Sequence, residues 1–228
     1  MALVVLIAGV WIVVESKSKG SLAFMSAAMA LAALVLLVCK LAKTTPAFVL
    51  AVMVIALSAW GLVASDPIKR FAFLFNGDST ITGRTYIWDF IYYRISQKPW
   101  IGWGYHSYWL VPNSPQLEAA SWIRDMPSSH SGFLEIRLDT GYVGYALFLA
   151  FKYSSLHGLE VVRRKDPARA WLFLSLAIYI ILLNFIESIW IQTDPLWMLY
   201  LIVTAETVRC SRTVDPDLAG AGRGVRPP

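Results

Sequence analysis

The sequence predicts an all-helical protein that crosses a membrane about six times and carries one long loop with interfacial helices. Three observations support this fold class. Of the 228 residues, 57% are apolar, which is well above the usual share in soluble domains. The longer apolar runs approach the ~20 residues that span a bilayer. The basic residues lie between these runs, as in cytoplasmic membrane loops, so the net charge of +5 indicates a bilayer rather than a nucleic acid as partner.

Six apolar runs are the predicted spans. They are Ala2–Val14, Leu22–Cys39, Ala47–Ser65, about Ser131–Lys152, Trp171–Ile186 and Ile189–Ala205. The first is short, and it fits either a signal-peptide core or the end of a spanning helix. The chain is therefore expected to hold three spans in residues 1–65, a long loop in 66–129, three spans in 130–207 and a disordered tail in 208–228.

The basic residues predict the orientation of the spans. The segment Arg163–Arg169 carries four basic side chains, and such clusters stay in the cytoplasm. Counting spans from there places the loop with Lys40 and Lys43, and both chain termini, in the cytoplasm. It places the 66–129 loop outside. Only Lys17 and Lys19 fall on the unfavoured side.

The outer loop is predicted to begin with an amphipathic helix near Thr82. Asp89, Tyr93 and Arg94 are expected to face away from its apolar side. The helix should end at Lys98–Pro99, since proline disfavours helix in the residue before it. The apolar side repeats at helical spacing and comprises Ile87, Trp88, Ile91, Tyr92 and Ile95.

Aromatic residues are concentrated in this loop, around the turns that Gly102 and Gly104 permit. Two interpretations stand side by side: an aromatic belt at the membrane interface, or a surface on which sugar rings stack. The residues concerned are Trp88, Trp100, Trp103, Tyr105, Tyr108 and Trp109.

The stretch Pro127–Gly144 combines a histidine with charges inside a predicted span. His130 precedes Glu135, Arg137 and Asp139. A charge near the centre of a span costs about 3 kcal/mol, so such residues indicate function unless they lie at the interface. If the helix began at His130, the imidazole would share a face with Arg137, two turns on. A histidine near carboxylates can act as a general base, or it can simply bond to one of them at the start of the helix.

Arg84 has two readings as well. It could pair with Asp78 or Asp89, or its guanidinium could clamp a phosphate through two parallel hydrogen bonds. Two isolated cysteines, Cys39 and Cys210, predict neither a disulfide nor a metal site, and no metal-ligand cluster is present in the sequence.

Taken in order, these segments resemble a known family. They are Thr-Gly-Arg-x-x-x-Trp at 82–88, Lys-Pro-Trp-Ile-Gly-Trp-Gly-Tyr-x-Ser-Tyr-Trp at 98–109, His-Ser-Gly-Phe-Leu-Glu-x-x-Leu-Asp-Thr-Gly-Tyr-Val-Gly at 130–144, and Asn-Phe-Ile-Glu-Ser at 184–188. The set is similar to the O-antigen ligase and polymerase superfamily, in particular its exopolysaccharide-production branch. The resemblance implies a multi-pass protein of the bacterial inner membrane with a large periplasmic loop. It implies transfer of glycan from an undecaprenyl-diphosphate carrier to a hydroxyl of an acceptor glycan or lipid A core, without metal or cofactor.

The resemblance also assigns roles to residues. Arg84 matches the diphosphate-binding arginine and His130 the catalytic histidine, while Ser131 stands where asparagine is common. Glu135 or Asp139 would orient His130 or bind sugar hydroxyls, and attack from the opposite face would invert the anomeric centre. The other residues expected to bind substrate are Trp103, Tyr105, Trp109, Arg124, Arg137 and Glu187.

The family's N-terminal half has no counterpart in this sequence, so the chain is expected to be a truncated product, one of two split pieces, or a degenerate copy. The alternative function is a glycan-binding or scaffolding membrane subunit without catalysis. A small transporter is disfavoured, because the second and third predicted spans contain almost no polar residues.

Overall fold

The computed structural model describes residues 19–53 and 83–212. The predicted first span, most of the third, the start of the long loop with Asp78, and nearly all of the tail lie outside these residues. Every regular element in the described ranges is helical. The elements are α2 (Lys19–Leu41), α5 (Arg84–Gln97), η1 (Pro115–Glu118), α6 (Ser121–Arg124), α7 (Gly132–His157), α8 (Leu159–Lys165), α9 (Pro167–Leu183) and α10 (Pro195–Arg212).

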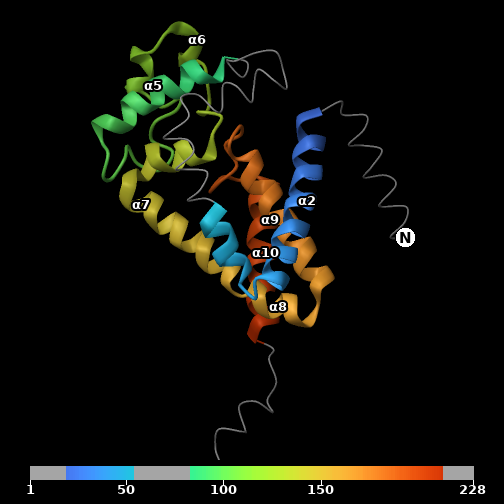
Figure 1. Ribbon diagram of the computed structural model, residues 1–228. Helices are drawn as coiled ribbons and strands as arrows, with labels where there is room; N and C mark the ends of the chain where they lie inside the picture. Colours follow the sequence, from blue (N-terminus) through green and yellow to red (C-terminus); the bar gives the residue numbers. More distant parts are fainter. Residues whose placement is uncertain (1–18, 54–82, 213–228) are drawn as a thin grey trace, which may run out of the picture.

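The helices form two groups, visible in Figure 1. We call α2, α8, α9 and α10 the bundle, in which α2 packs along α9 and α10 contacts both α8 and α9. We call α5, η1, α6 and the connecting segments between residues 98 and 131 the outer end. The long helix α7 joins the two groups, because its first half contacts α5 and its second half contacts α10.

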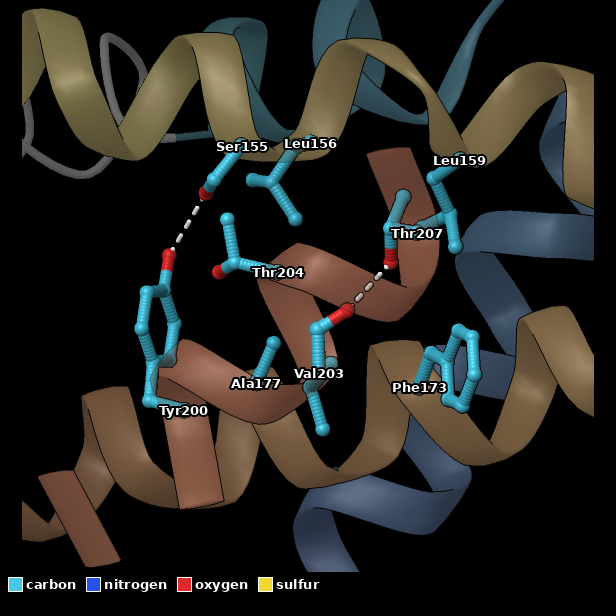
Figure 2. A pocket seen from close by; sticks show the side chains of 9 residues that line it. All are labelled: Ser155, Leu156, Leu159, Phe173, Ala177, Tyr200, Val203, Thr204 and Thr207. Atoms are coloured by element: carbon cyan, nitrogen blue, oxygen red, sulfur yellow. Dashed lines mark hydrogen bonds between the residues drawn. The ribbon is translucent and has the colours of Figure 1, made fainter. Parts of the chain in front are cut away.

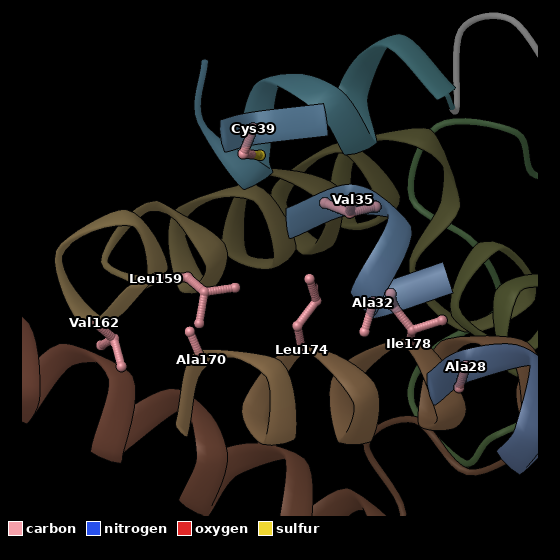
Figure 3. Close-up of a cluster of buried hydrophobic side chains, with 9 residues drawn as sticks. All are labelled: Ala28, Ala32, Val35, Cys39, Leu159, Val162, Ala170, Leu174 and Ile178. Carbon is pink, nitrogen blue, oxygen red and sulfur yellow. The ribbon is translucent and has the colours of Figure 1, made fainter. Parts of the chain in front are cut away.

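The core of the bundle is built from small and branched apolar side chains (Figure 3). Small residues let helix backbones approach closely, as is common between membrane helices. By length and composition, one helix in the described ranges could cross a membrane, at Leu22–Leu41, and the shorter Pro167–Leu183 is also apolar. The second predicted span is thus confirmed as a helix. The buried residues are Ala28, Ala32, Val35, Cys39, Leu159, Val162, Ala170, Leu174 and Ile178.

The amphipathic helix of the outer loop is confirmed as α5, which ends at Gln97 as the proline predicts. Its buried side chains Ile87, Ile91 and Ile95 pack with Leu134 and Leu138 of α7. The expected orientations of two residues are wrong: Tyr92, expected on the apolar side, is exposed, and Arg94, expected on the other side, is buried.

Arg94 was expected to face away from the apolar side of α5, yet it is buried. Its guanidinium donates to a Glu118 carboxylate oxygen at 2.7 Å and to the Pro115 carbonyl at 3.1 Å. Segment 115–118 folds over this side of the helix and supplies the acceptors, so the arginine is buried with its charge paired.

The predicted fourth span is interrupted at Gly141, where φ is 63° and ψ is −162°. Such a conformation is essentially restricted to glycine. A break in a helix frees backbone groups that need partners, and here the partners come from the segment 99–104. The bonds run from Tyr142 N to Pro99 O (2.7 Å), Val143 N to Trp100 O (3.2 Å), Trp103 N to Leu138 O (2.8 Å) and Gly104 N to Asp139 O (2.9 Å).

The end of the fourth span also differs from expectation. The helix α7 continues to His157 rather than ending at Lys152. Lys152 is buried against α10, with Nζ 3.3 Å from the centre of the Tyr200 ring. Lys152 is buried because side chains of α10, including the Tyr200 ring, cover this side of α7.

The last two predicted spans need correction at their junction. The helix α9 ends at Leu183 rather than Ile186, and α10 begins at Pro195 rather than Ile189. Asn184 holds the intervening turn, because its Oδ1 accepts from the backbone N–H groups of Ile189 (3.1 Å) and Trp190 (3.0 Å). Asp194 then caps α10 by accepting from Leu196 N at 2.7 Å.

The segments that carry the predicted topology lie at opposite ends of the molecule. The basic helix α8 and the C-terminal end of α2 lie together, since Cys39 packs with Leu159 and Val162. Figure 1 shows this end opposite α5 and α6. The relative placement agrees with the predicted orientation, and the membrane sides themselves stay a prediction.

Candidate functional site

One carboxylate joins the two residues predicted to carry the chemistry. An oxygen of Glu187 lies 2.8 Å from Nη2 of Arg84, and its other oxygen lies 3.5 Å from Nδ1 of His130. Nη1 of Arg84 donates to the carbonyl of Ile186. The exposed fractions are 18% for Arg84, 29% for His130 and 45% for Glu187, so solvent and ligands can reach the cluster. The guanidinium and the imidazole therefore share one partly exposed site.

Backbone contacts between two distant segments create this arrangement. The N–H of Gly132 points at the turn after α9, where the carbonyls of Asn184 (3.0 Å) and Glu187 (2.9 Å) accept. The N–H of Ser131 donates to Ser188 Oγ at 3.1 Å. A Cβ on Gly132 would lie 2.0 Å from Asn184 Oδ1, so only glycine permits this approach. The segment 130–132 and the segment 184–188 are thus held face to face.

His130 itself precedes the helix. Its φ is +52°, a left-handed conformation that is uncommon for residues other than glycine, and α7 begins two residues later at Gly132. The premise of a helix starting at His130 is therefore wrong, and the predicted face shared with Arg137 does not exist. The unusual backbone directs the imidazole toward Glu187 instead of along α7.

Glu135 positions the loop that carries His130. It is buried, and its oxygens accept from the backbone N–H of Ser129 at 2.8 Å and from the indole of Trp109 at 3.0 Å. Trp88 adds a bond from its indole to the Ser129 carbonyl at 3.0 Å. The carboxylate next to the imidazole is Glu187, whereas Glu135 contacts the backbone just before it.

Asp139 lies near a second histidine, in the segment that meets the break in α7. Its Oδ2 accepts from the backbone N–H of His106 at 3.4 Å. The ring of His106 contacts that of Tyr105, with 4.3 Å between centroids. Tyr105 is exposed, and its hydroxyl donates to the Ile191 carbonyl at 2.6 Å. The hydrogen bond from Tyr105 to Ile191 therefore joins the loop 103–109 to the turn before α10.

The aromatic residues of the outer end divide into two sets. Tyr108 is fully buried, and the indole of Trp103 donates to the Arg94 carbonyl at 3.0 Å. Burial raises the pKa of the Tyr108 phenol above its ordinary value. Trp100 and Tyr105, in contrast, are exposed. The first set is structural, and the second remains available to a membrane or a glycan.

The two other arginines predicted to bind substrate have contacts of their own. Arg124 donates from Nε to the Ala119 carbonyl at 2.9 Å, within the turn between η1 and α6. Arg137 donates from Nη2 to the Tyr142 hydroxyl at 3.2 Å. Neither shows a contact with Arg84, His130 or Glu187.

Sequence reasoning missed the residues that hold the site together. Glu187 is the ion-pair partner of Arg84 in place of the expected Asp89, and Asp78 lies outside the described residues. Gly132, Asn184 and Ser129 were given no positioning role. The available signal was the motif at 184–188, whose polar residues interrupt an apolar run.

A small cavity in the described part of the chain lies elsewhere, between α7, α8, α9 and α10 (Figure 2). Its volume is about 10 Å³, enough for about one water. Ser155 and Tyr200 close one side through a hydroxyl contact of 2.8 Å. Within the described residues, no three His, Cys, Asp or Glu side chains are grouped as metal ligands.

Comparison with known proteins identifies the family. The family described as O-antigen ligase matches residues 2–149. A Rickettsia felis protein provisionally named a polysaccharide ligase is 29% identical over 125 residues, which cover 52% of this chain and 31% of that protein. The matched stretch therefore spans about a third of the relative's length. No solved structure matches the chain. Since the family match covers well over half of the sequence and includes both Arg84 and His130, the chain belongs to the O-antigen ligase family.

Proposed function

We propose that the protein transfers a glycan from an undecaprenyl-diphosphate carrier to a hydroxyl of an acceptor glycan or lipid A core. The reaction would take place at the periplasmic face of the bacterial inner membrane. The observation that carries the proposal is the bridge of Glu187 between Arg84 and His130. It joins a group suited to phosphate with a group suited to a hydroxyl proton, at the end of the molecule opposite the basic helix α8.

Arg84 would bind the diphosphate of the donor. Glu187 accepts a hydrogen bond from Nη2, and the carbonyl of Ile186 accepts one from Nη1. A diphosphate oxygen would replace the carboxylate at Nη2, because phosphate suits the guanidinium fork. The arginine would then offset the charge that develops on the leaving diphosphate, an electrostatic effect that is often the largest in catalysis. This route uses the arginine in the role that a metal ion has in other transferases.

His130 would act as general base. Glu187 faces Nδ1 at 3.5 Å, which leaves Nε2 for the acceptor hydroxyl. A carboxylate at one ring nitrogen orients the imidazole and strengthens it as a base. The acceptor oxygen would attack the anomeric carbon as its proton moves to Nε2, and the bond from that carbon to the diphosphate oxygen would break. Attack on the face opposite the leaving group inverts the anomeric centre.

Glu187 couples the two roles. While Arg84 is bound to the carboxylate, the negative charge is shared between a guanidinium and an imidazole. Once the diphosphate takes Arg84, Glu187 is left to His130 alone. Donor binding would therefore leave the carboxylate to orient the imidazole before the acceptor reacts. Tyr105 is exposed at the outer end and would contact the glycan, together with Asp139.

Complementation of a strain that lacks its own ligase or polymerase tests the proposal. Arg84→Ala and His130→Ala should abolish the transferred glycan, and Glu187→Gln should reduce it strongly. Arg164→Ala and His157→Ala are matched controls, since they remove the same residue types near the opposite end of the molecule. Full glycan from both Arg84→Ala and His130→Ala would refute the mechanism.

A second candidate is a glycan-binding or scaffolding subunit. The observation that favours it is that the matched stretch spans only 31% of the relative, so catalysis could depend on segments of the relative that lie outside this stretch. Purified protein that binds lipid-linked glycan but never transfers it would support this alternative.

A further inference from the structure

Arg137 occupies an unusual environment at the junction of α5 and α7. Its guanidinium lies 5.1 Å from the ring centre of Tyr142, 5.8 Å from that of Tyr92 and 5.9 Å from that of Tyr145. Nη2 donates to the Tyr142 hydroxyl at 3.2 Å. Three phenol rings therefore surround one cation and hold it in place through attraction to their faces.

The charge of Arg137 is not offset by a carboxylate in the described part of the chain. The two carboxylates nearest to it on α7, those of Glu135 and Asp139, accept hydrogen bonds from other partners. Nε of Arg137 is buried without an acceptor. The arginines with carboxylate partners are Arg84, Arg94, Arg163, Arg164, Arg169 and Arg209. Arg137 thus differs from them in offering an uncompensated charge.

An exposed apolar surface adjoins the cation. Trp100 and Ile101, at the tip of the segment that meets Gly141, are 68% and 76% exposed. Beyond the break, Val143 and Leu147 of α7 are also exposed. The one charged side chain between Tyr142 and Tyr153 is Lys152, which is buried toward α10. This surface of α7 therefore presents no charge over several turns.

We infer that Arg137, Tyr92, Tyr142 and Tyr145 form a binding site for the headgroup phosphate of an anionic phospholipid. The guanidinium would form parallel hydrogen bonds to two phosphate oxygens, and the phenol hydroxyls would donate to the remaining oxygens. The acyl chains would lie along Val143 and Leu147. Trp100 would sit at the level of the headgroups, where amphipathic rings concentrate.

This site is separate from the one proposed for transfer. It uses a different arginine, on a different helix, with no contact to Arg84 or Glu187. Its occupant is a bilayer lipid that fixes the outer end at the membrane surface, rather than a substrate. Lipid binding can therefore be measured whether or not the protein transfers glycan.

The test is lipid binding by the purified full chain in mild detergent, followed by native mass spectrometry. Phosphatidylglycerol should bind more tightly than phosphatidylcholine. Arg137→Gln should weaken phosphatidylglycerol binding roughly five- to tenfold, the effect of one cation near an anionic headgroup. Arg164→Gln, an exposed arginine on α8, should leave it unchanged. Equal affinity of wild type and Arg137→Gln, or equal binding of the two lipids, would overturn the assignment.

Further arms separate the sources of phosphate and guard against misfolding. Millimolar inorganic phosphate should not displace the lipid, because the acyl chains contribute to binding; displacement would assign the site to a small anion instead. Undecaprenyl phosphate that outcompetes phosphatidylglycerol would assign it to the carrier. Tyr142→Phe removes one hydroxyl but no charge and should weaken binding about twofold. An unchanged affinity in this variant, if Arg137→Gln does not fold, would overturn the proposal.

Discussion

The outer end and the bundle are stabilised in different ways, and two cations show the contrast. At the outer end, Arg84 is held by a carboxylate and a carbonyl, and half-exposed polar groups surround it. Where α7 packs against the bundle, Lys152 is 8% exposed, and its Nζ has no hydrogen-bond partner. The lysine faces aromatic rings alone, with the Trp190 centroid at 3.2 Å and that of Tyr200 at 3.3 Å.

The difference separates exchangeable contacts from fixed ones. Oxygens of a ligand can take the place of Glu187 on Arg84 at little energetic cost, since each is an acceptor for the same donor. The aromatic rings around Lys152, in contrast, are buried and cannot be replaced by a ligand or by solvent. We therefore expect changes at the outer end to alter function more than stability, unless they touch its backbone joints, and changes in the bundle to do the reverse.

The largest effect should come from the backbone joint at Gly141. A Cβ there would lie 2.3 Å from the Trp100 backbone, and φ is +63°. Gly141→Ala should lower the free energy of unfolding by about 3 kcal/mol or more. Gly83→Ala is the matched control, because φ at Gly83 is +81° but a Cβ there would have nothing within 4 Å. This variant should lower the free energy of unfolding by about 1 kcal/mol. Thermal unfolding in detergent measures the stability of both variants. Equal losses of stability would contradict the claim that the close backbone contact of Gly141 with Trp100 stabilises the fold.

The next effect tests the lysine among the rings. Lys152→Glu should destabilise the protein by about 3 kcal/mol, because the ring faces repel a buried negative charge. Lys152→Met should stay within about 1 kcal/mol of wild type, since the lost attraction to the rings is offset by the relief of burying a charge. The same unfolding measurement applies. A large loss in Lys152→Met would mean that the rings outweigh desolvation.

A smaller effect on stability is expected at the site. Because Glu187 is 45% exposed, a double-mutant cycle of Arg84→Gln and Glu187→Gln should give a coupling energy of about 0.5 to 1 kcal/mol. The transferred glycan should nevertheless fall strongly in each single variant. Large destabilisation with intact transfer would reverse the comparison between the two regions.

The smallest effect concerns pH at the opposite end. Hydrogen bonds from Arg163 and Arg164, with their charges, lower the pKa of Glu160 from its ordinary value. A depressed folded pKa gives stability that is present above the unfolded pKa and is lost as the pH falls through the folded one. Glu160→Gln should therefore cost under about 1 kcal/mol at pH 7. Its difference from wild type should shrink below about pH 4, as unfolding curves at several pH values can show.

The sequence was informative where a local signal decides the structure. Hydropathy predicts α2, proline predicts the end of α5 at Gln97, and the ordered motifs predict the family. The meeting of Arg84 and His130 follows from those motifs too, although the carboxylate that joins them was placed only among the substrate-binding residues.

The remaining features depend on contacts between distant segments. Gly141 lies in an apolar run that reads as unbroken helix, and only the segment 99–104 makes its break stable. Arg94 is buried because segment 115–118 supplies acceptors, and Lys152 because α10 supplies rings. One local signal was overlooked, since Asp194 before Pro195 is a typical helix start.

The break in α7 also bears on how the chain assembles as it is made. The segment 99–104, whose backbone bonds to Leu138, Asp139, Tyr142 and Val143, leaves the ribosome before the helix that it completes. The free backbone groups on both sides of Gly141 thus emerge to find their partners already synthesised. In a circular permutant that reversed this order, the backbone groups beside Gly141 would have no partner, within the bilayer or at the bilayer surface, until segment 99–104 was synthesised.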